Sequence, residues 1–257
     1  MTATARRDTL VVIPAYNEER HIGDVVGGVR TVLPTADVLV IDDGSRDRTR
    51  FVARGAGARV VSHVFNLGYG AALQTGYKRA DRDGYAYVVQ LDADGQHPPA
   101  ALPQLLEPLR LGTADVVIGS RFVEVSAYRM GAARTLARRL LGRLLVLLGG
   151  PRVADPTSGL QALARPAFRS CCGEFYPTDF PDIDVLLFLH RQGLRIAEIP
   201  VEMAPSPPGK VALHGGLRDV YYMYKMLLST FRSRLGPGRV PGRETVMAAQ
   251  SHEEVPS

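Results

Sequence analysis

Short apolar runs alternate with longer amphipathic stretches along the first half of the chain. Runs rich in Val, Ile and Leu end in polar turn residues, as strands buried on both faces of a parallel sheet do. The expected strands are residues 10–13, 38–41, 59–62, 87–91 and 115–119, and the expected helices are residues 18–33, 47–55, 69–80 and 98–111. This alternation predicts an α/β fold with a doubly wound, mostly parallel sheet flanked by helices.

Ligands of such sheets bind beyond the carboxyl ends of the strands. Polar stretches follow expected strands at residues 14–18, 42–45 and 92–96. We therefore expect the chemistry of the protein in these stretches.

Two carboxylates, Asp92 and Asp94, directly follow the fourth expected strand. Side chains two residues apart on extended backbone point the same way, so both carboxylates converge at the strand end. Hard oxygen ligands of this kind suit Mg²⁺ or Mn²⁺ that bridges phosphates, and Gln96 and His97 are further possible ligands. The alternative is an acidic turn that merely ends the strand.

The ends of the first two expected strands have residues suited to a nucleotide. Asp42 could hold a ribose or base edge, while Tyr16 offers an aromatic face and Glu18 a carboxylate for ribose hydroxyls. The alternatives are local, because Asp42 could form an Asx turn and Asn17 could cap the next helix. Three such stretches at one sheet edge favour the functional interpretation.

Two later segments have the pattern of basic amphipathic helices. Residues 125–154 contain arginines without an acidic residue, and residues 217–231 are rich in Tyr, Met and Leu. At helical spacing one leucine face lies opposite the charges of Arg138, Arg139 and Arg143; it comprises Leu136, Leu140, Leu144 and Leu148. Such helices could lie in a membrane interface, or their apolar faces could pack on the core or on a partner subunit.

Composition and charge limit the number of domains, the type of partner and the cellular compartment that we expect. The chain has 257 residues and a formal net charge of +5, which suits one large domain and anionic partners. Cys171 and Cys172 are adjacent and unsuited to a mutual disulfide, which indicates a reducing compartment. No apolar run reaches the roughly 18 residues of a membrane span, and no signal peptide is evident. We expect a cytoplasmic protein that is peripheral to the inner face of the plasma membrane.

Four stretches together resemble the family 2 glycosyltransferases of the GT-A fold. They are VIPAYNEE at residues 12–19, VIDDGSRDRT at 40–49, NLGYGAA at 66–72 and LDADGQH at 91–97. Within the family the chain resembles the dolichyl-phosphate mannosyltransferase and bacterial polyprenyl-phosphate sugar transferase branch. The branch matches are GSRF at 119–122, DPTSG at 155–159 and GLRIAEIPV at 193–201.

We expect a GT-A domain over residues 9–212, after a flexible N-terminus at residues 1–8. An amphipathic helix over residues 213–235 and a disordered tail over residues 236–257 would follow.

The resemblance also implies roles for single residues. The nucleotide would be bound by Pro14, Tyr16, Glu18 and Asp42. The metal ion on the diphosphate would be held by Asp92, Asp94 and Gln96. The acceptor phosphate would be received by Arg121, Arg134 and Ser158, since the planar fork of Arg binds phosphate through two bonds.

The residues expected to act most directly in the transfer are Asp94, Arg121 and Asp155. Asp155 could be a general base, could orient the acceptor-site arginines or could begin a turn, and we expect an active-site role without assigning proton transfer. Either Asp182 or Asp184 is expected at an acidic position that the branch has nearby.

The chain departs from the branch at residues 206–211. Related chains often have an Arg three residues before a Gly and a Ser after it, and both are missing here. Lys210 or His214 could supply the positive charge instead. The departure bears on the identity of the donor more than on the reaction class.

The resemblance implies an inverting transferase that moves a sugar from a GDP- or UDP-linked donor to a polyprenyl phosphate of the undecaprenyl, decaprenyl or dolichyl type, with Mg²⁺ or Mn²⁺ as cofactor. A membrane surface or a small membrane protein is the further expected partner. Two alternatives stay open: transfer to a hydroxyl of a soluble glycan or metabolite, and an inactive scaffold of a membrane complex. Nucleic acid is not expected, because the arginines lie on a leucine-backed helix without interleaved aromatic residues.

Overall fold

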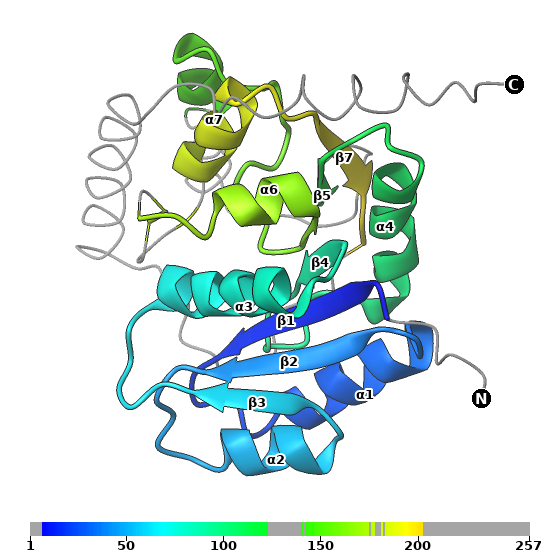
Figure 1. Cartoon of the computed structure of the whole chain (residues 1–257), viewed down its shortest axis with the longest axis vertical. Helices are drawn as coiled ribbons and strands as arrows, with labels where there is room; N and C mark the ends of the chain where they lie inside the picture. The colour runs from blue at the N-terminus through cyan, green and yellow to red at the C-terminus, as the bar shows by residue number, and fades with distance from the viewer. Residues whose placement is uncertain are drawn as a thin grey trace, which may run out of the picture.

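The computed structural model of the protein describes residues 7–122, 140, 142–174, 176–177, 181 and 183–202. These residues form a seven-stranded sheet with helices on both faces (Figure 1). The α/β fold and the mostly parallel sheet expected from the sequence are confirmed.

The strands are β1 (Thr9–Ala15), β2 (Asp37–Asp42), β3 (Arg59–Ser62), β4 (Tyr87–Gln90), β5 (Val116–Ser120), β6 (Gln161–Ala164) and β7 (Ile196–Pro200). Their order in the sheet is β3-β2-β1-β4-β6-β5-β7. Strand β6 runs antiparallel to β4 and β5, while the other pairs are parallel. The start of β6 therefore lies at the same edge as the carboxyl ends of the parallel strands, which we call the carboxyl edge.

Helices α1 (Ile22–Val32), α2 (Thr49–Gly55) and α4 (Leu102–Arg110) cover one face together with the 3₁₀ helix η1 (Pro99–Ala101). Helices α3 (Tyr69–Asp83), α6 (Arg165–Ser170) and α7 (Ile183–Arg191) cover the other. Alternate residues of β1 serve the two cores, because Leu10 and Val12 pack toward α3 whereas Val11 and Ile13 pack toward α1. Burial on both faces explains why the strands have continuous apolar sequences.

Several helix boundaries differ from the expected ones. The helices expected from residues 18 and 47 begin at Ile22 and Thr49, because the residues before them form loops that bond to each other. Helix α3 continues past Ala80 until Gly84, whose φ of 76° ends it. The helix expected over residues 98–111 is divided into η1 and α4.

The basic segment expected over residues 125–154 is described only in part. Residues 142–147 are helical, and Leu144 and Leu148 pack against the core, as the packing alternative predicted. Leu145, outside the expected stripe, is fully buried, and Leu140 is exposed. Leu145 therefore joins the leucines that pack on the core, while Leu140 does not pack there.

The described helices include none that is long and apolar enough to span a membrane. The expected amphipathic helix over residues 213–235 and the tail over residues 236–257 lie outside the described residues. At the other end, Arg7 and Asp8 belong to the stretch expected to be flexible, yet both have contacts. Arg7 pairs with Asp37 at 2.7 Å, and the Asp8 carbonyl accepts the N–H groups that begin β4.

The contact between α3 and β1 depends on Gly76, because an added Cβ would overlap the side chain of Val12. We expect Gly76→Ala to lower the free energy of unfolding by about 1–3 kcal/mol. Gly27→Ala on α1 is the matched control, since no atom lies within 4 Å of its Cβ position. It should raise stability by up to about 1 kcal/mol through helix propensity. Urea unfolding measures both, and equal effects would contradict the assigned packing.

Candidate functional site at the carboxyl edge

The loops that follow β1 and β2 are joined by hydrogen bonds between backbone and side chains. The Asn17 N–H donates to Ser45 Oγ at 3.0 Å, and the Arg46 N–H donates to Asn17 Oδ1 at 2.9 Å. The Glu18 N–H donates to Thr49 Oγ1 at 2.8 Å. Asn17 has a φ of 57°, a left-handed conformation that Asn adopts more readily than most residues. Asn17 thus joins the loops and does not cap α1.

Acidic side chains complete this junction. Asp47 Oδ2 accepts the Glu19 N–H at 3.2 Å, and a Glu19 carboxylate oxygen accepts the Arg48 N–H at 2.9 Å. Burial opposes ionisation of Asp47, but hydrogen bonds from the hydroxyl and N–H of Thr49 and from the Glu19 N–H outweigh it and lower the pKa of Asp47. Asp47 is therefore a charged acceptor that holds both loops.

The four residues expected at the nucleotide lie in and beside these loops. Pro14 is buried within β1, Tyr16 is exposed and Glu18 is half-buried. Asp42 is buried at the end of β2, and its Oδ1 accepts the Ser45 N–H at 3.0 Å. The Asx-turn contact that the sequence offered as an alternative role for Asp42 is therefore present. The four residues also lie together at the carboxyl edge.

Asp43 organises the connection from β3 to α3. Its buried carboxylate accepts the N–H groups of Leu67 and Gly68, both at 2.9 Å, and contacts His63 Nδ1 at 2.7 Å. His63 Nε2 lies 3.0 Å from Thr75 Oγ1 on α3. The connection is thus fixed to the loop after β2 through one carboxylate.

Asp92 is held from three sides. The Tyr69 hydroxyl donates to its Oδ1 at 2.8 Å, and His97 Nε2 lies 2.9 Å from its Oδ2. Gly159 packs against the carboxylate, because an added Cβ would lie 2.9 Å from Asp92 Cγ. The buried Nδ1 of His97 has no hydrogen-bond partner among the described residues, so the polar contact of that ring within this part of the chain is the one from Nε2 to Asp92. These contacts give Asp92 a single orientation.

Asp94 and Gln96 lie one turn further along the same loop, where Asp94 Oδ1 accepts the Gln96 N–H at 3.0 Å. The described part of the chain has no group of three His, Cys, Asp or Glu side chains placed to hold a metal ion. Two carboxylates and an amide still fit Mg²⁺ or Mn²⁺, which proteins commonly bind through one or two carboxylates together with substrate phosphates. The donor set therefore suits an ion that arrives with a diphosphate.

The turn before β6 is held by buried glutamines. Gln90 Nε2 donates to the Gly159 carbonyl at 3.2 Å, and Gln161 Nε2 donates to the Ser158 carbonyl at 3.0 Å. The Ser158 hydroxyl donates to the Gly119 carbonyl at 2.6 Å and is buried. Ser158 thus joins the turn to β5 here, and its role at an acceptor phosphate stays a prediction.

Arg121 and Asp155 form a bidentate ion pair. Arg121 Nε donates to Asp155 Oδ2 at 2.7 Å, and Nη2 donates to Oδ1 at 2.9 Å. Asp155 is fully buried, while the Arg121 side chain is partly exposed. Glu198 on β7 holds the backbone of the loop that carries Asp155, since its carboxylate accepts the N–H groups of Ala154 and Asp155 at 2.6 and 2.8 Å.

Three further residues were predicted near the site. Arg134 and Asp182 lie outside the described residues. Asp184 is buried in the first turn of α7, where its Oδ1 accepts the Val185 N–H at 2.8 Å.

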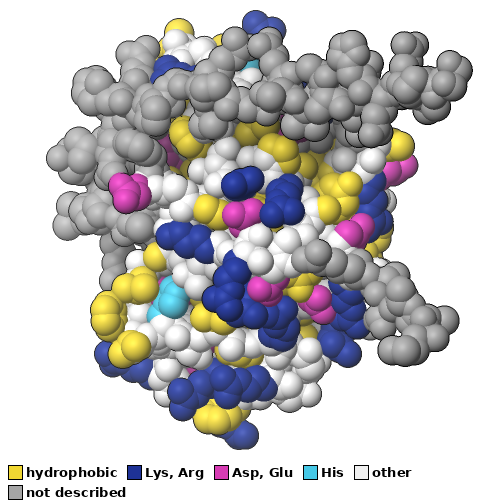
Figure 2. All heavy atoms as spheres, viewed as in Figure 1, with side chains coloured by type: hydrophobic (Ala, Val, Ile, Leu, Met, Phe, Trp, Pro, Cys, Tyr) yellow, Lys and Arg dark blue, Asp and Glu magenta, His cyan; other side chains and the backbone are white. Residues whose placement is uncertain are grey.

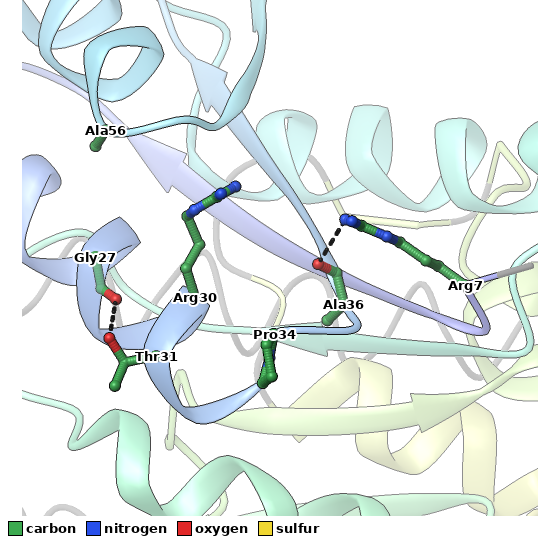
Figure 3. A pocket seen from close by; sticks show the side chains of 7 residues that line it. All are labelled: Arg7, Gly27, Arg30, Thr31, Pro34, Ala36 and Ala56. Carbon is green, nitrogen blue, oxygen red and sulfur yellow. Dashed lines mark hydrogen bonds between the residues drawn. The ribbon is translucent and has the colours of Figure 1, made fainter. Parts of the chain in front are cut away.

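A hollow of about 340 Å³ lies away from these residues (Figure 3). It is lined by Arg7, Gly27, Arg30, Thr31, Pro34, Ala36 and Ala56. Arg7 and Ala36 directly precede the starts of β1 and β2, so the hollow lies at the edge opposite the carboxyl edge. It takes no part in the candidate site.

The strand order and the loops at the carboxyl edge are those of a GT-A glycosyltransferase, and a solved structure agrees. It is glucosyl-3-phosphoglycerate synthase from Mycobacterium tuberculosis, in complex with Mn²⁺, UDP and glucosyl-3-phosphoglycerate. The alignment covers 90% of this chain and 80% of that one, with a TM-score of 0.66 and 25% identity.

Sequence comparisons define the family. The profile of Glycosyl transferase family 2 matches residues 10–170. Polyprenol monophosphomannose synthase of Mycolicibacterium smegmatis is 30% identical over 250 residues, covering 93% of this chain and 92% of that protein. Undecaprenyl-phosphate mannosyltransferase of Micrococcus luteus is 32% identical over 220 residues, covering 81% and 88%. The chain therefore belongs to glycosyl transferase family 2, which confirms the resemblance based on its motifs.

Sequence reasoning left four residues of this edge without a role: Asp43, His63, Tyr69 and Glu198. Tyr69 and Glu198 occur in the stretches that carry the resemblance, so their place in a motif was a signal. Nothing in the sequence shows that they contact the Asp92 carboxylate or the Asp155 loop.

Tyr69→Phe removes the hydroxyl that donates to Asp92 Oδ1 and keeps the aromatic ring. We expect the affinity for Mn²⁺ in the presence of a nucleotide diphosphate to fall by a factor of about 10–100, because a bond to a charged group contributes about 1.5–3 kcal/mol. Tyr85→Phe is the matched control, since its hydroxyl donates to Asp37 at 2.6 Å at the opposite edge.

Titration calorimetry of the two variants measures their affinity for Mn²⁺ with a nucleotide diphosphate. Both should lose some stability, but only Tyr69→Phe should lose ligand affinity. Equal affinities would show that the Tyr69 contact does not position Asp92 for binding.

Proposed function

We propose that the protein transfers a sugar, with inversion, from a nucleotide diphosphate sugar to a polyprenyl phosphate at the cytoplasmic face of the membrane. The observation that carries the proposal is the position of Arg121. This cation is fixed by a buried carboxylate at the same edge as Asp92, and the turn of Gly159 joins the two. The names of the mannosyltransferase relatives, which refer to polyprenol and undecaprenyl phosphate, support the acceptor class.

The loops after β1 and β2 would bind the nucleotide through Pro14, Tyr16, Glu18 and Asp42. Their joint hydrogen bonds fix the loops before the ligand arrives, which lowers the entropy cost of binding. The exposed ring of Tyr16 is available to a base, and the Glu18 carboxylate to ribose hydroxyls. The donor is GDP- or UDP-linked, and UDP is the nucleotide in the solved relative.

Asp92, Asp94 and Gln96 would hold Mg²⁺ or Mn²⁺. When bound, such an ion neutralises the negative charge of the departing diphosphate as a Lewis acid. Tyr69 and His97 orient the Asp92 carboxylate for this task, and Gly159 leaves room for it.

Arg121 would bind the acceptor phosphate together with Arg134 and Ser158. Two of the five N–H donors of its guanidinium are directed to Asp155, which fixes the plane of the group. Asp155 is fully buried in this pair, and we assign it the orientation of Arg121 rather than proton transfer. An acceptor phosphate is ionised near neutral pH, so a strong general base is unnecessary. A phosphate oxygen forms the bond to the anomeric carbon as the bond to the diphosphate breaks.

A transfer assay tests the reaction. Radiolabelled GDP- and UDP-linked sugars, incubated with detergent-dispersed undecaprenyl or decaprenyl phosphate, should yield label that organic solvent extracts. EDTA should abolish transfer, and Mn²⁺ or Mg²⁺ should restore it. Donor binding without label on any lipid would contradict the acceptor and favour a soluble hydroxyl. Failure to bind any nucleotide sugar would favour a scaffold.

Arg121→Lys tests the acceptor site, because it keeps the charge but loses the bidentate fork. We expect KM for polyprenyl phosphate to rise about tenfold or more, equivalent to about 1.4 kcal/mol, while donor affinity stays unchanged. Arg195→Lys is the matched control, since Arg195 forms the same kind of pair with Asp115 at 3.1 and 3.3 Å. That pair lies where β5 and β7 begin, at the opposite edge. An unchanged KM in Arg121→Lys would exclude the guanidinium from the acceptor site.

A further inference from the structure

The connection from β3 to α3 exposes several large apolar side chains. The exposed fractions are 96% for Val64, 66% for Phe65 and 45% for Leu67. Hydrophobic side chains gather at the left edge in Figure 2, where the β3–α3 connection lies in Figure 1. We call residues 63–68 the apolar loop.

The apolar loop is held in place on both sides. Asp43 accepts the N–H groups of Leu67 and Gly68, and the backbone of Phe65 and Asn66 packs on Gly44. At Gly44 an added Cβ would lie 2.7 Å from the Asn66 nitrogen. The fold therefore presents these side chains to solvent in a fixed arrangement, although burying each would be favourable by about 1.5–3 kcal/mol.

Exposed arginines lie at the same edge of the sheet as the apolar loop. Arg20, Arg46, Arg48 and Arg50 are exposed in the loops after β1 and β2 and in the first turn of α2. In the part of the chain that the structure describes, none of these four side chains takes part in an ion pair. Apolar side chains next to exposed arginines match a bilayer surface with anionic headgroups.

We propose that Val64, Phe65 and Leu67 enter the boundary between headgroups and acyl chains of an anionic membrane. This inference rests on the proposed function, because a lipid-borne acceptor requires the carboxyl edge to approach a bilayer. A protein partner fits less well, since a standard interface buries about 800 Å² on each side and a large aromatic side chain supplies only about 150–250 Å². The contact would aim the donor and acceptor sites at the membrane.

The chain has no tryptophan, so Phe65→Trp introduces a single fluorescent reporter. Its emission is measured with vesicles of phosphatidylglycerol and phosphatidylcholine that lack polyprenyl phosphate. We expect a shift to shorter wavelength and quenching by lipids brominated on their acyl chains. Leu111→Trp is the control, because Leu111 is 69% exposed but follows α4 at the opposite edge. It should show neither effect.

A second pair of variants measures the contribution to binding. The double substitution Val64→Ser and Phe65→Ser should lower vesicle partitioning about tenfold or more, whereas Leu111→Ser should not. Transfer to detergent-dispersed acceptor should keep its kcat in both. Replacing phosphatidylglycerol by phosphatidylcholine alone, or adding salt, should weaken binding of the parent protein.

Several results would overturn the inference. One is an emission spectrum of Phe65→Trp that does not change when vesicles are added. This includes a spectrum that is already at short wavelength in buffer, which would mean that another part of the chain or a second copy covers the loop. Another is a sedimentation experiment in which the parent protein is a dimer and the double serine variant is a monomer. That result would mean that the loop binds a second copy of the chain. Transfer without a vesicle response refutes the loop contact and keeps the proposed function. A vesicle response without transfer to lipid refutes the acceptor and keeps the loop contact.

Discussion

The reversal of β6 between β4 and β5 is the constraint on which both halves of the site depend. A parallel strand here would place its preceding turn at the opposite edge, about one strand length away. Because β6 is antiparallel, the turn of Asp155 and Gly159 meets the loop that carries Asp92. The absence of a side chain at Gly159 lets the turn approach the Asp92 carboxylate, and the Gln90 side chain donates to the Gly159 carbonyl. The residues that we propose for the donor and those that we propose for the acceptor thus share one edge.

Burial of charge explains the fixed geometry of the Arg121–Asp155 pair, which we propose for the acceptor phosphate. An ionised carboxylate without exposure is stable only when donors surround it, and loss of one partner of a buried pair costs about 3–5 kcal/mol. Asp155 meets this requirement through Arg121, while Glu198 binds the backbone of the same loop. The three residues come from segments far apart in the sequence, so β5, β6 and β7 must all be in place before the guanidinium is oriented. The cost of burial therefore makes the geometry of Arg121 a property of the whole sheet.

The sequence predicted the layers, and it predicted that the polar stretches after the parallel strands share one edge, because both depend on local patterns. Strands buried on both faces are continuous apolar runs, and polar residues that follow parallel strands must meet at one edge. The start of α1 was wrong because Asn17 bonds the loop after β2, a partner that no local rule identifies. Strand β6 was missed because its four residues, Gln-Ala-Leu-Ala, include no β-branched or aromatic side chain. Asp42 and Asp43 are neighbours of the same type, and only the packed loops assign the second one to His63 and Gly68.

Position at the sheet edge, and not residue type, separates the site from ordinary structure in this protein. A tyrosine hydroxyl bonds a carboxylate at both edges, as Tyr69 with Asp92 and as Tyr85 with Asp37. The Tyr85–Asp37 pair belongs to a compact network in which burial and the neighbouring carboxylate raise the pKa of Tyr85 to about 12. Asp92 instead borders the loop of Asp94 and Gln96 at the carboxyl edge, where oxygen ligands gather. The same type of contact therefore lies inside the candidate site at one edge and outside it at the other, because parallel strands bring loops together at their carboxyl ends.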